Sequence, residues 1–79
     1  TILFMEAHEV SHFIFKHKKT SIQNEAEADY GGIILCKSKK LTMSYKIGLR
    51  NFKERNNVTF KEFQKKYGTR LNKYLNAHI

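Results

Sequence analysis

Apolar residues recur three or four positions apart along most of the 79-residue chain, and the sequence contains no proline. This spacing is typical of the buried face of a helix, and without proline or a Gly/Ser-rich linker no internal domain boundary is visible. The pattern predicts one helix over residues 2–17 and three more that begin near residues 21, 42 and 59. We therefore expect a mainly α chain that forms a single domain.

Local signals predict where some of these helices begin and end. Thr59 and Glu62 have the spacing of a capping box, in which each side chain bonds the backbone N–H of the other residue. Ser21 and Asn24 are alternative N-caps for the second helix. Gly68 marks a point at which the fourth helix could be interrupted.

The first two helices also carry packing signals. The first helix has a broad apolar stripe, which includes Ile2, Phe4 and Phe13 and predicts a helix buried on most of its sides. Ile22 is expected on the buried side of the second helix. The pair Gly31–Gly32, unfavourable within a helix, predicts either close helix packing or a kink.

The segment EAHEVSH, residues 6–12, contains the most specific chemical pattern in the chain. His8 and His12 are one helical turn apart, so both imidazoles can point at one ion. Glu9 is rotated by about 100° from His8 and can reach a water molecule that the ion acidifies. This is the H-E-x-x-H arrangement of zinc metallopeptidases. The alternative is an ordinary amphipathic helix with two incidental histidines.

The segment NEAEAD, residues 24–29, supplies what H-E-x-x-H lacks. A catalytic zinc needs a third protein ligand, and a short turn could fold Glu25 back onto the two histidines. Asp29, one turn after Glu25, could accept the free N–H of a liganding histidine. Glu27 remains an alternative third ligand, although its spacing to Asp29 is less suitable than that of Glu25.

Residues 4–36 resemble the ImmA/IrrE family of zinc peptidases. Asp29, four residues after Glu25, instead resembles the pattern of the wider gluzincin group. The matching residues are Phe4, Ala7, His8, Glu9, His12, His17, Glu25, Glu27, Ala28 and Leu35. The resemblance implies Zn²⁺ bound by His8, His12 and Glu25, with Glu9 as the general base. The chain departs from the family pattern at Ser11, Asp29 and Gly31–Gly32, and none of these changes removes a ligand or the base.

The resemblance also carries expectations about fold and substrate. It implies the helical core of a zincin-like metallopeptidase domain, and we expect residues 1–79 to be a fragment that lacks the upstream sheet. Within it, residues 1–36 would form the metal-binding helix pair and residues 37–79 a basic helical part. The implied activity is hydrolysis of peptide bonds in a protein substrate, and a helix-turn-helix repressor of a phage or mobile element is a candidate.

Four other residues have a plain structural interpretation and a functional alternative. His17 could orient the site, but a polar residue favoured by the dipole at a helix C-terminus is the preferred interpretation. Tyr30 could stabilise an oxyanion, but a core tyrosine is preferred. Cys36 is interpreted as a small buried hydrophobe, and His78 is assigned no role.

Charge is distributed unevenly along the chain, whose formal net charge is +8. Five of the seven acidic residues precede residue 31, whereas most of the lysines and arginines follow Gly32. A basic surface of this kind predicts contact with nucleic acid as an alternative or additional function. The residues concerned are Lys37, Lys39, Lys40, Arg50, Lys53, Arg55, Lys65, Lys66, Arg70 and Lys73.

Two alternatives to the peptidase therefore remain open. One is a basic helical DNA-binding module, and the other is an inactive zinc-binding remnant. A single cysteine and the lack of a long apolar run predict a cytoplasmic protein without a membrane segment.

Overall fold

The computed structural model describes residues 2–19 and 21–78, with side chains from Met5 onward. These residues form four helices: α1 (Ile2–Ile14), α2 (Ile22–Ser38), α3 (Thr42–Asn56) and α4 (Phe60–Asn76). No strand occurs within the described residues, which confirms the mainly α prediction. None of the helices described is long and apolar enough to cross a membrane.

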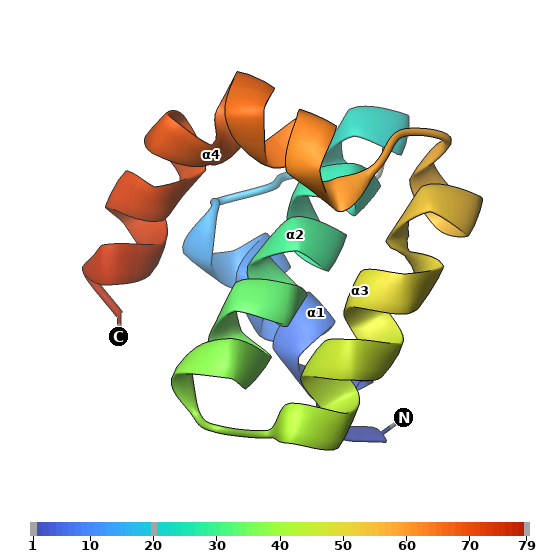
Figure 1. Cartoon of the computed structure of the whole chain (residues 1–79). Coiled ribbons are helices and arrows are strands. Elements are labelled where there is room, and N and C mark those ends of the chain that lie inside the picture. The colour runs from blue at the N-terminus through green and yellow to red at the C-terminus, as the bar shows by residue number, and fades with distance from the viewer. Residues whose placement is uncertain (1, 20, 79) are drawn as a thin grey trace.

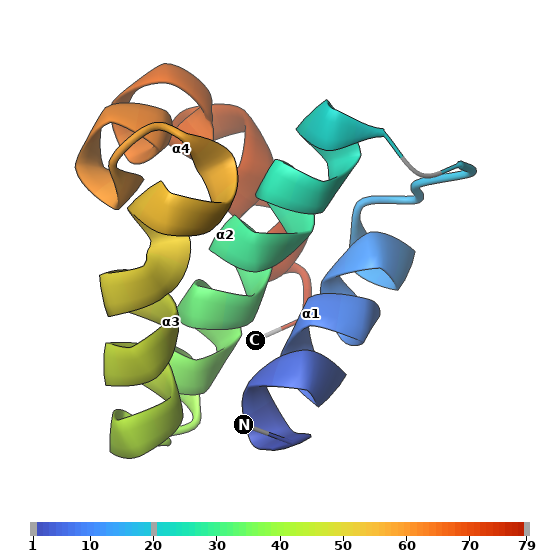
Figure 2. The same cartoon turned by 90° about the vertical axis from the view of Figure 1, so that its right-hand side faces the viewer.

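Helix α2 occupies the centre of the molecule. The helices α1, α2 and α3 lie side by side with α2 between the other two (Figure 2), and α4 crosses the end of α2 and α3 (Figure 1). The fully buried side chains of the core include Tyr30 and Ile33 from α2, Phe52 from α3, and Leu71 and Leu75 from α4. The core therefore joins the predicted metal-binding part to the basic part.

The helix starts predicted near residues 21, 42 and 59 are all observed, and two of them have predicted caps. The Thr59 hydroxyl accepts a hydrogen bond from the Glu62 backbone N–H, and the Glu62 carboxylate accepts one from the Thr59 backbone N–H, which confirms the capping box of α4. The N-cap of α2 is Ser21, whose hydroxyl accepts from the backbone N–H of Asn24. Helix α4 continues through Gly68, so the predicted interruption there is wrong.

The prediction that the first helix extends to residue 17 is wrong. Lys16 adopts a left-handed conformation with φ 59°, and the backbone N–H groups of Lys16 and His17 bond back to the carbonyls of Phe13 and His12. These two bonds form a Schellman motif, which ends α1 at Ile14. Glycine usually occupies the left-handed position of this motif, and the sequence has lysine there, so no local signal marked the end.

Two packing expectations are also corrected. Phe13 is 80% exposed, and Met5 and Val10 are exposed as well, so α1 is buried on one side rather than on most sides. The side chains of Ile2 and Phe4 lie outside those described. Ile22 is 91% exposed because it occupies the first turn of α2, beyond the edge of the core.

Close packing explains one of the two central glycines of α2. A Cβ atom added at Gly31 would lie 2.5 Å from the Ser11 Oγ and 2.9 Å from a ring carbon of Phe15. The backbone of α2 can approach α1 at this point only because no side chain intervenes. Ser11, which adjoins the metal motif on α1, is fully buried in this contact and donates its hydroxyl to the carbonyl of Ala7.

Candidate metal centre

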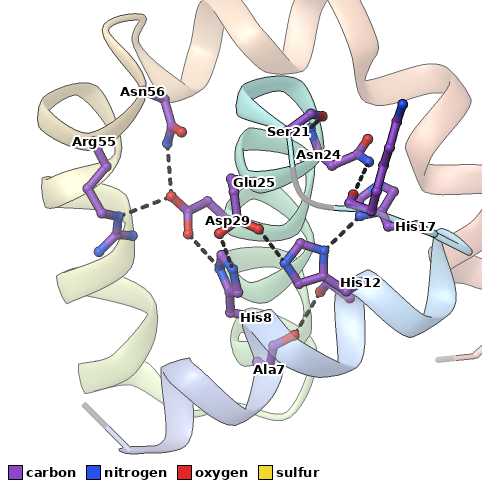
Figure 3. A network of polar contacts seen from close by, with 12 residues as sticks. Ala7, His8, His12, His17, Ser21, Asn24, Glu25, Asp29, Arg55 and Asn56 are labelled. Atoms are coloured by element: carbon purple, nitrogen blue, oxygen red, sulfur yellow. Dashed lines mark hydrogen bonds and ion pairs between the residues drawn. The ribbon is translucent and has the colours of Figure 1, made fainter.

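The residues of the two sequence motifs face each other across the α1–α2 interface (Figure 3). His8 and His12 lie one turn apart on α1, and Glu25 and Asp29 lie one turn apart on α2. The close approach at Gly31 fixes the separation of the helices near this point. The site is therefore assembled by two rigid elements rather than by loops.

Glu25 lies between the two imidazoles. Its Oε1 is 3.4 Å from His8 Nε2 and its Oε2 is 2.8 Å from His12 Nε2. The side chain of Glu25 is 43% exposed, whereas His8 is buried and His12 is partly buried. Two ring nitrogens and one carboxylate thus converge on a point that remains accessible from one side.

The other nitrogen of His8 is held by Asp29. His8 Nδ1 lies 2.7 Å from Asp29 Oδ1, and Asp29 Oδ2 accepts hydrogen bonds of 3.0 Å from both Arg55 Nε and Asn56 Nδ2. The hydrogen bond to Asp29 raises the pKa of His8 above its ordinary value of 6.5, although burial opposes this effect. Burial alone would raise the pKa of Asp29, but its hydrogen bonds with His8 and Asn56 and the positive charge of Arg55 lower it overall.

The other nitrogen of His12 is held by His17. The two Nδ1 atoms are 2.9 Å apart, and His17 Nε2 lies 2.9 Å from Glu27 Oε1. In the Schellman motif, the side chains at the positions of His12 and His17 are those that normally make a hydrophobic contact. Here this contact is a hydrogen bond between imidazoles, so the turn that ends α1 also orients His12.

Glu27 belongs to this supporting network and not to the convergence point. Its Oε2 accepts hydrogen bonds from Gln23 at 2.9 Å and from Arg70 on α4 at 2.8 Å. Burial would raise the pKa of Glu27, but the hydrogen bonds from Gln23, His17 and Arg70 outweigh it and lower the pKa below its ordinary value of 4.5. Of the two alternative third ligands, the structure brings Glu25 rather than Glu27 to the Nε2 atoms.

The hydrogen-bond network determines which ring nitrogens can bind a cation. We assign the Nδ1 proton of His8 to the bond with Asp29, because an ionised carboxylate can only accept. His17 donates its Nε2–H to Glu27, so in its neutral form its Nδ1 accepts the Nδ1–H of His12. In this arrangement His8 and His12 both direct Nε2 toward Glu25, and each has its Nδ1–H bonded to a neighbouring side chain, as is usual for histidines that bind a metal.

One of the two contacts of Glu25 has the length expected between two ligands of a zinc ion. Ligands of a tetrahedral zinc, each about 2.1 Å from the ion, lie about 3.4 Å apart. The His8–Glu25 distance of 3.4 Å matches this value. The His12–Glu25 distance of 2.8 Å is that of a hydrogen bond. For both groups to bind one zinc ion, the proton between them would have to leave and the two atoms would have to move apart by about 0.6 Å.

Glu9 is the second carboxylate near the histidines. One of its oxygens and one ring nitrogen from each of His8 and His12 all lie within 4.8 Å of one another. Glu9 is exposed and belongs to the same helix as the histidines, whereas Glu25 contacts both Nε2 atoms from the opposite helix. Either carboxylate could complete a metal site with the two histidines: Glu25 from the opposite helix, or Glu9 from the same helix on the solvent side.

Two surface hollows meet at Glu9 and Glu25. One, of about 360 Å³, extends past His12 and His17 to Lys18 and Lys19. The other, of about 410 Å³, extends past His8 and Asp29 to Arg55, Asn56 and Met5. An extended chain crossing the convergence point would therefore find space on both sides of it.

The remaining sequence candidates lie elsewhere. Tyr30 is fully buried, and its hydroxyl donates to Asn72 Oδ1 at 2.9 Å, so it is a core residue. Cys36 is fully buried, and burial raises the pKa of its thiol, as expected for an unreactive cysteine. His78 is exposed and is not part of the network described above.

Sequence analysis missed several residues of the supporting network. Arg55 and Asn56 reach Asp29 from α3, and Arg70 reaches Glu27 from α4, across sequence separations of 26, 27 and 43 residues. No local pattern could reveal these contacts. The role of His17 had one available signal, its match to the later histidine of the resembled family.

Comparisons of the chain with protein-family models, with curated proteins and with solved structures found no match. The case for a metal centre therefore rests on the contacts of its residues.

Proposed function

We propose that this protein is a zinc-dependent metallopeptidase whose metal is held by His8, His12 and Glu25. The single observation that carries the proposal is the convergence of both Nε2 atoms on Glu25 while both Nδ1 atoms are engaged by hydrogen bonds. Incidental histidines on an amphipathic helix have no reason to share one carboxylate and to have partners on their opposite nitrogens.

The chemistry divides between the ion and Glu9. Zinc held at this point would acidify a water molecule and polarise a substrate carbonyl. Glu9, exposed beside the ligands, would accept the proton of the attacking water and deliver it to the departing amine. Asp29 and His17 keep the two imidazoles oriented, and the hollows on either side leave room for an extended peptide.

The substrate class follows from the same reasoning and from the sequence resemblance. An open, solvent-facing site suits a protein segment rather than a small enclosed ligand. The resemblance to the ImmA/IrrE family makes a helix-turn-helix repressor of a phage or mobile element the first substrate to test.

The first test measures the zinc content of the purified chain by elemental analysis after reconstitution and removal of loose metal. We expect about one zinc per chain and a large loss in Glu25→Ala. The control is Glu6→Ala, which removes an exposed acid from the same region without touching the convergence point. Absence of zinc from the wild-type chain, or equal loss in both variants, would refute the metal centre.

The second test separates catalysis from metal binding. Glu9→Gln is expected to keep its zinc but to hydrolyse a susceptible peptide or repressor about 10²- to 10⁴-fold more slowly than the wild type. Cleavage is measured by mass spectrometry of the products. Full zinc occupancy without hydrolysis by the wild-type chain would instead assign the site a structural role.

A further inference from the structure

A second charged surface lies away from the metal centre, at the junction of α1 and α4. Four cations line a groove of about 660 Å³ there: Lys16, Lys66, Arg70 and Lys73. No acidic residue lines the groove within the part of the chain that the structure describes. Tyr74, whose ring is partly exposed, also contributes to the lining.

The groove is built by the ends of two elements. Lys66, Arg70 and Lys73 are spaced by four and three residues, so they share one face of α4 over two turns. Lys16 occupies the left-handed position of the Schellman motif that ends α1. The basic surface thus depends on the tertiary arrangement and is not only a property of α4.

One of the four cations is engaged by an acid. Arg70 forms an ion pair of 2.8 Å with Glu27, although its side chain remains 54% exposed. Lys66 lies over the ring of its neighbour Tyr67, with Nζ 5.3 Å from the ring centre. In the described residues no ion pair involves Lys16, Lys66 or Lys73. The groove therefore carries an excess of about three positive charges.

We propose that this groove binds the phosphate backbone of a nucleic acid. Lys66 and Lys73 are about 10 Å apart along the helix axis, which suits an extended ligand with regularly repeated charges better than one compact anion. Phosphates on a nucleic-acid strand recur every 3.4 Å or so along the axis. The exposed part of Tyr74 offers a surface on which a base of a single strand can stack.

A lipid surface fits this face less well. Helices that bind membranes insert an apolar face beneath their cationic one. The apolar face of α4 is instead committed to the core through Phe63, Leu71 and Leu75, each of which is buried. The exposed face of α4 therefore offers charge and one exposed ring, that of Tyr74, but no continuous apolar face to insert.

The test measures binding of a fluorescent 20-nucleotide single strand and of the corresponding duplex over a range of salt concentrations. Chelator is present throughout, so the result does not depend on the proposed metal or on peptidase activity. The variant is Lys66→Ala/Lys73→Ala. The matched control is Lys46→Ala/Lys61→Ala, which removes the same charge at exposed positions outside the groove.

Loss of two phosphate contacts should lower the slope of log K against log salt by about 1.8 for the duplex. We expect the groove variant to bind at least 10-fold more weakly than the control at about 0.1 M salt, where surface charge is still only partly screened. Tyr74→Leu, which keeps an apolar side chain against Phe15, should weaken single-strand binding about 5- to 100-fold and duplex binding much less.

Three results would overturn the proposal. Equal weakening of the groove variant and its control would show that binding is diffuse. No binding of either oligonucleotide at about 50 mM salt, where phosphate contacts are strong, would refute the proposal that the groove binds nucleic acid. Tighter binding to polyglutamate or to phosphatidylserine vesicles than to both oligonucleotides, lost in the groove variant, would assign the groove to an acidic protein or a lipid surface.

Discussion

At the scale of single residues, the centre depends on buried carboxylates that are fully satisfied. Asp29 accepts hydrogen bonds from His8, Arg55 and Asn56, and it remains ionised although it is buried. An ionised carboxylate in this position keeps the His8 proton on Nδ1 and leaves Nε2 directed at Glu25. Removing its charge should therefore affect His8 more than the fold of the chain around it.

The first prediction concerns Asp29→Asn. An asparagine would lose the charge that fixes the orientation of His8, and its amide hydrogens would face the donors of Arg55 and Asn56. Zinc affinity, measured by competition with a chromogenic chelator, should fall about 10- to 100-fold. The control is Glu54→Gln, which removes one exposed carboxylate from α3. An affinity within twofold of the wild type in Asp29→Asn would show that the bond from His8 to Asp29 does not support metal binding.

At the scale of elements, the sequence was sufficient to predict those features of the helices that depend on a few neighbouring residues. The capping box at Thr59 and Glu62 and the one-turn spacings His8–His12 and Glu25–Asp29 can all be recognised locally, and each occupies the expected helix. The end of α1 could not be recognised, because lysine replaces glycine at the left-handed position. The network around His17 depends on that turn, which is why a role of His17 in orienting the site was only the alternative interpretation from the sequence.

Helix packing gives the second prediction, for Gly31→Ala. Alanine favours a helix by about 1 kcal/mol over glycine, but here its Cβ would lie 2.5 Å from the Ser11 Oγ and 2.7 Å from the Ser11 Cβ. Overpacking of this kind costs about 1–3 kcal/mol. The free energy of unfolding, measured with urea, should therefore fall despite the better helix propensity.

Gly68→Ala on α4 provides the comparison. Its Cβ would lie 3.1 Å from Gln64 Cγ and 3.2 Å from the Tyr30 hydroxyl oxygen, and Gln64 is an exposed side chain that can move. Its loss of stability should be clearly smaller than that of Gly31→Ala. A more stable Gly31→Ala protein would mean that α1 and α2 can separate at little cost, and the rigid spacing inferred for the site would then be wrong.

At the scale of the whole molecule, the acidic and basic parts are tied together through the candidate metal centre. Arg55 from α3 pairs with Asp29, and Arg70 from α4 pairs with Glu27. Both acids are buried; Asp29 bonds to His8 directly, and Glu27 supports His12 through His17. The uneven charge of the sequence therefore does more than create a basic surface, because two of its cations stabilise the site built by the first two helices.

The third prediction is a stability profile of the metal-free chain with a maximum between about pH 4.5 and 6.5. The raised pKa of His8 means that its contribution is complete below 6.5 and is lost as pH rises through the raised value. The lowered pKa values of Glu27 and Asp29 mean that their contributions are complete above 4.5 and are lost as pH falls through the lowered values. A difference of one bound proton between the folded and unfolded chain changes the free energy of unfolding by at most about 1.4 kcal/mol per pH unit.

Zinc should reverse the fall in stability that this profile shows on its alkaline side, so that stability rises with pH there. An ion held at the proposed site would bind the lone pair of His8 Nε2, so protonated His8 would compete with it, and binding would become tighter as pH rises through the raised pKa. Urea unfolding is measured between about pH 3 and 9, a range that includes the ordinary pKa values of carboxylates and histidine. The series is recorded once with chelator and once with excess zinc. We expect the optimum to move to higher pH only with zinc. If stability with chelator rises steadily from pH 6 to about 8, the protonated His8 between Asp29 and Glu25 is not a stabilising feature of the fold.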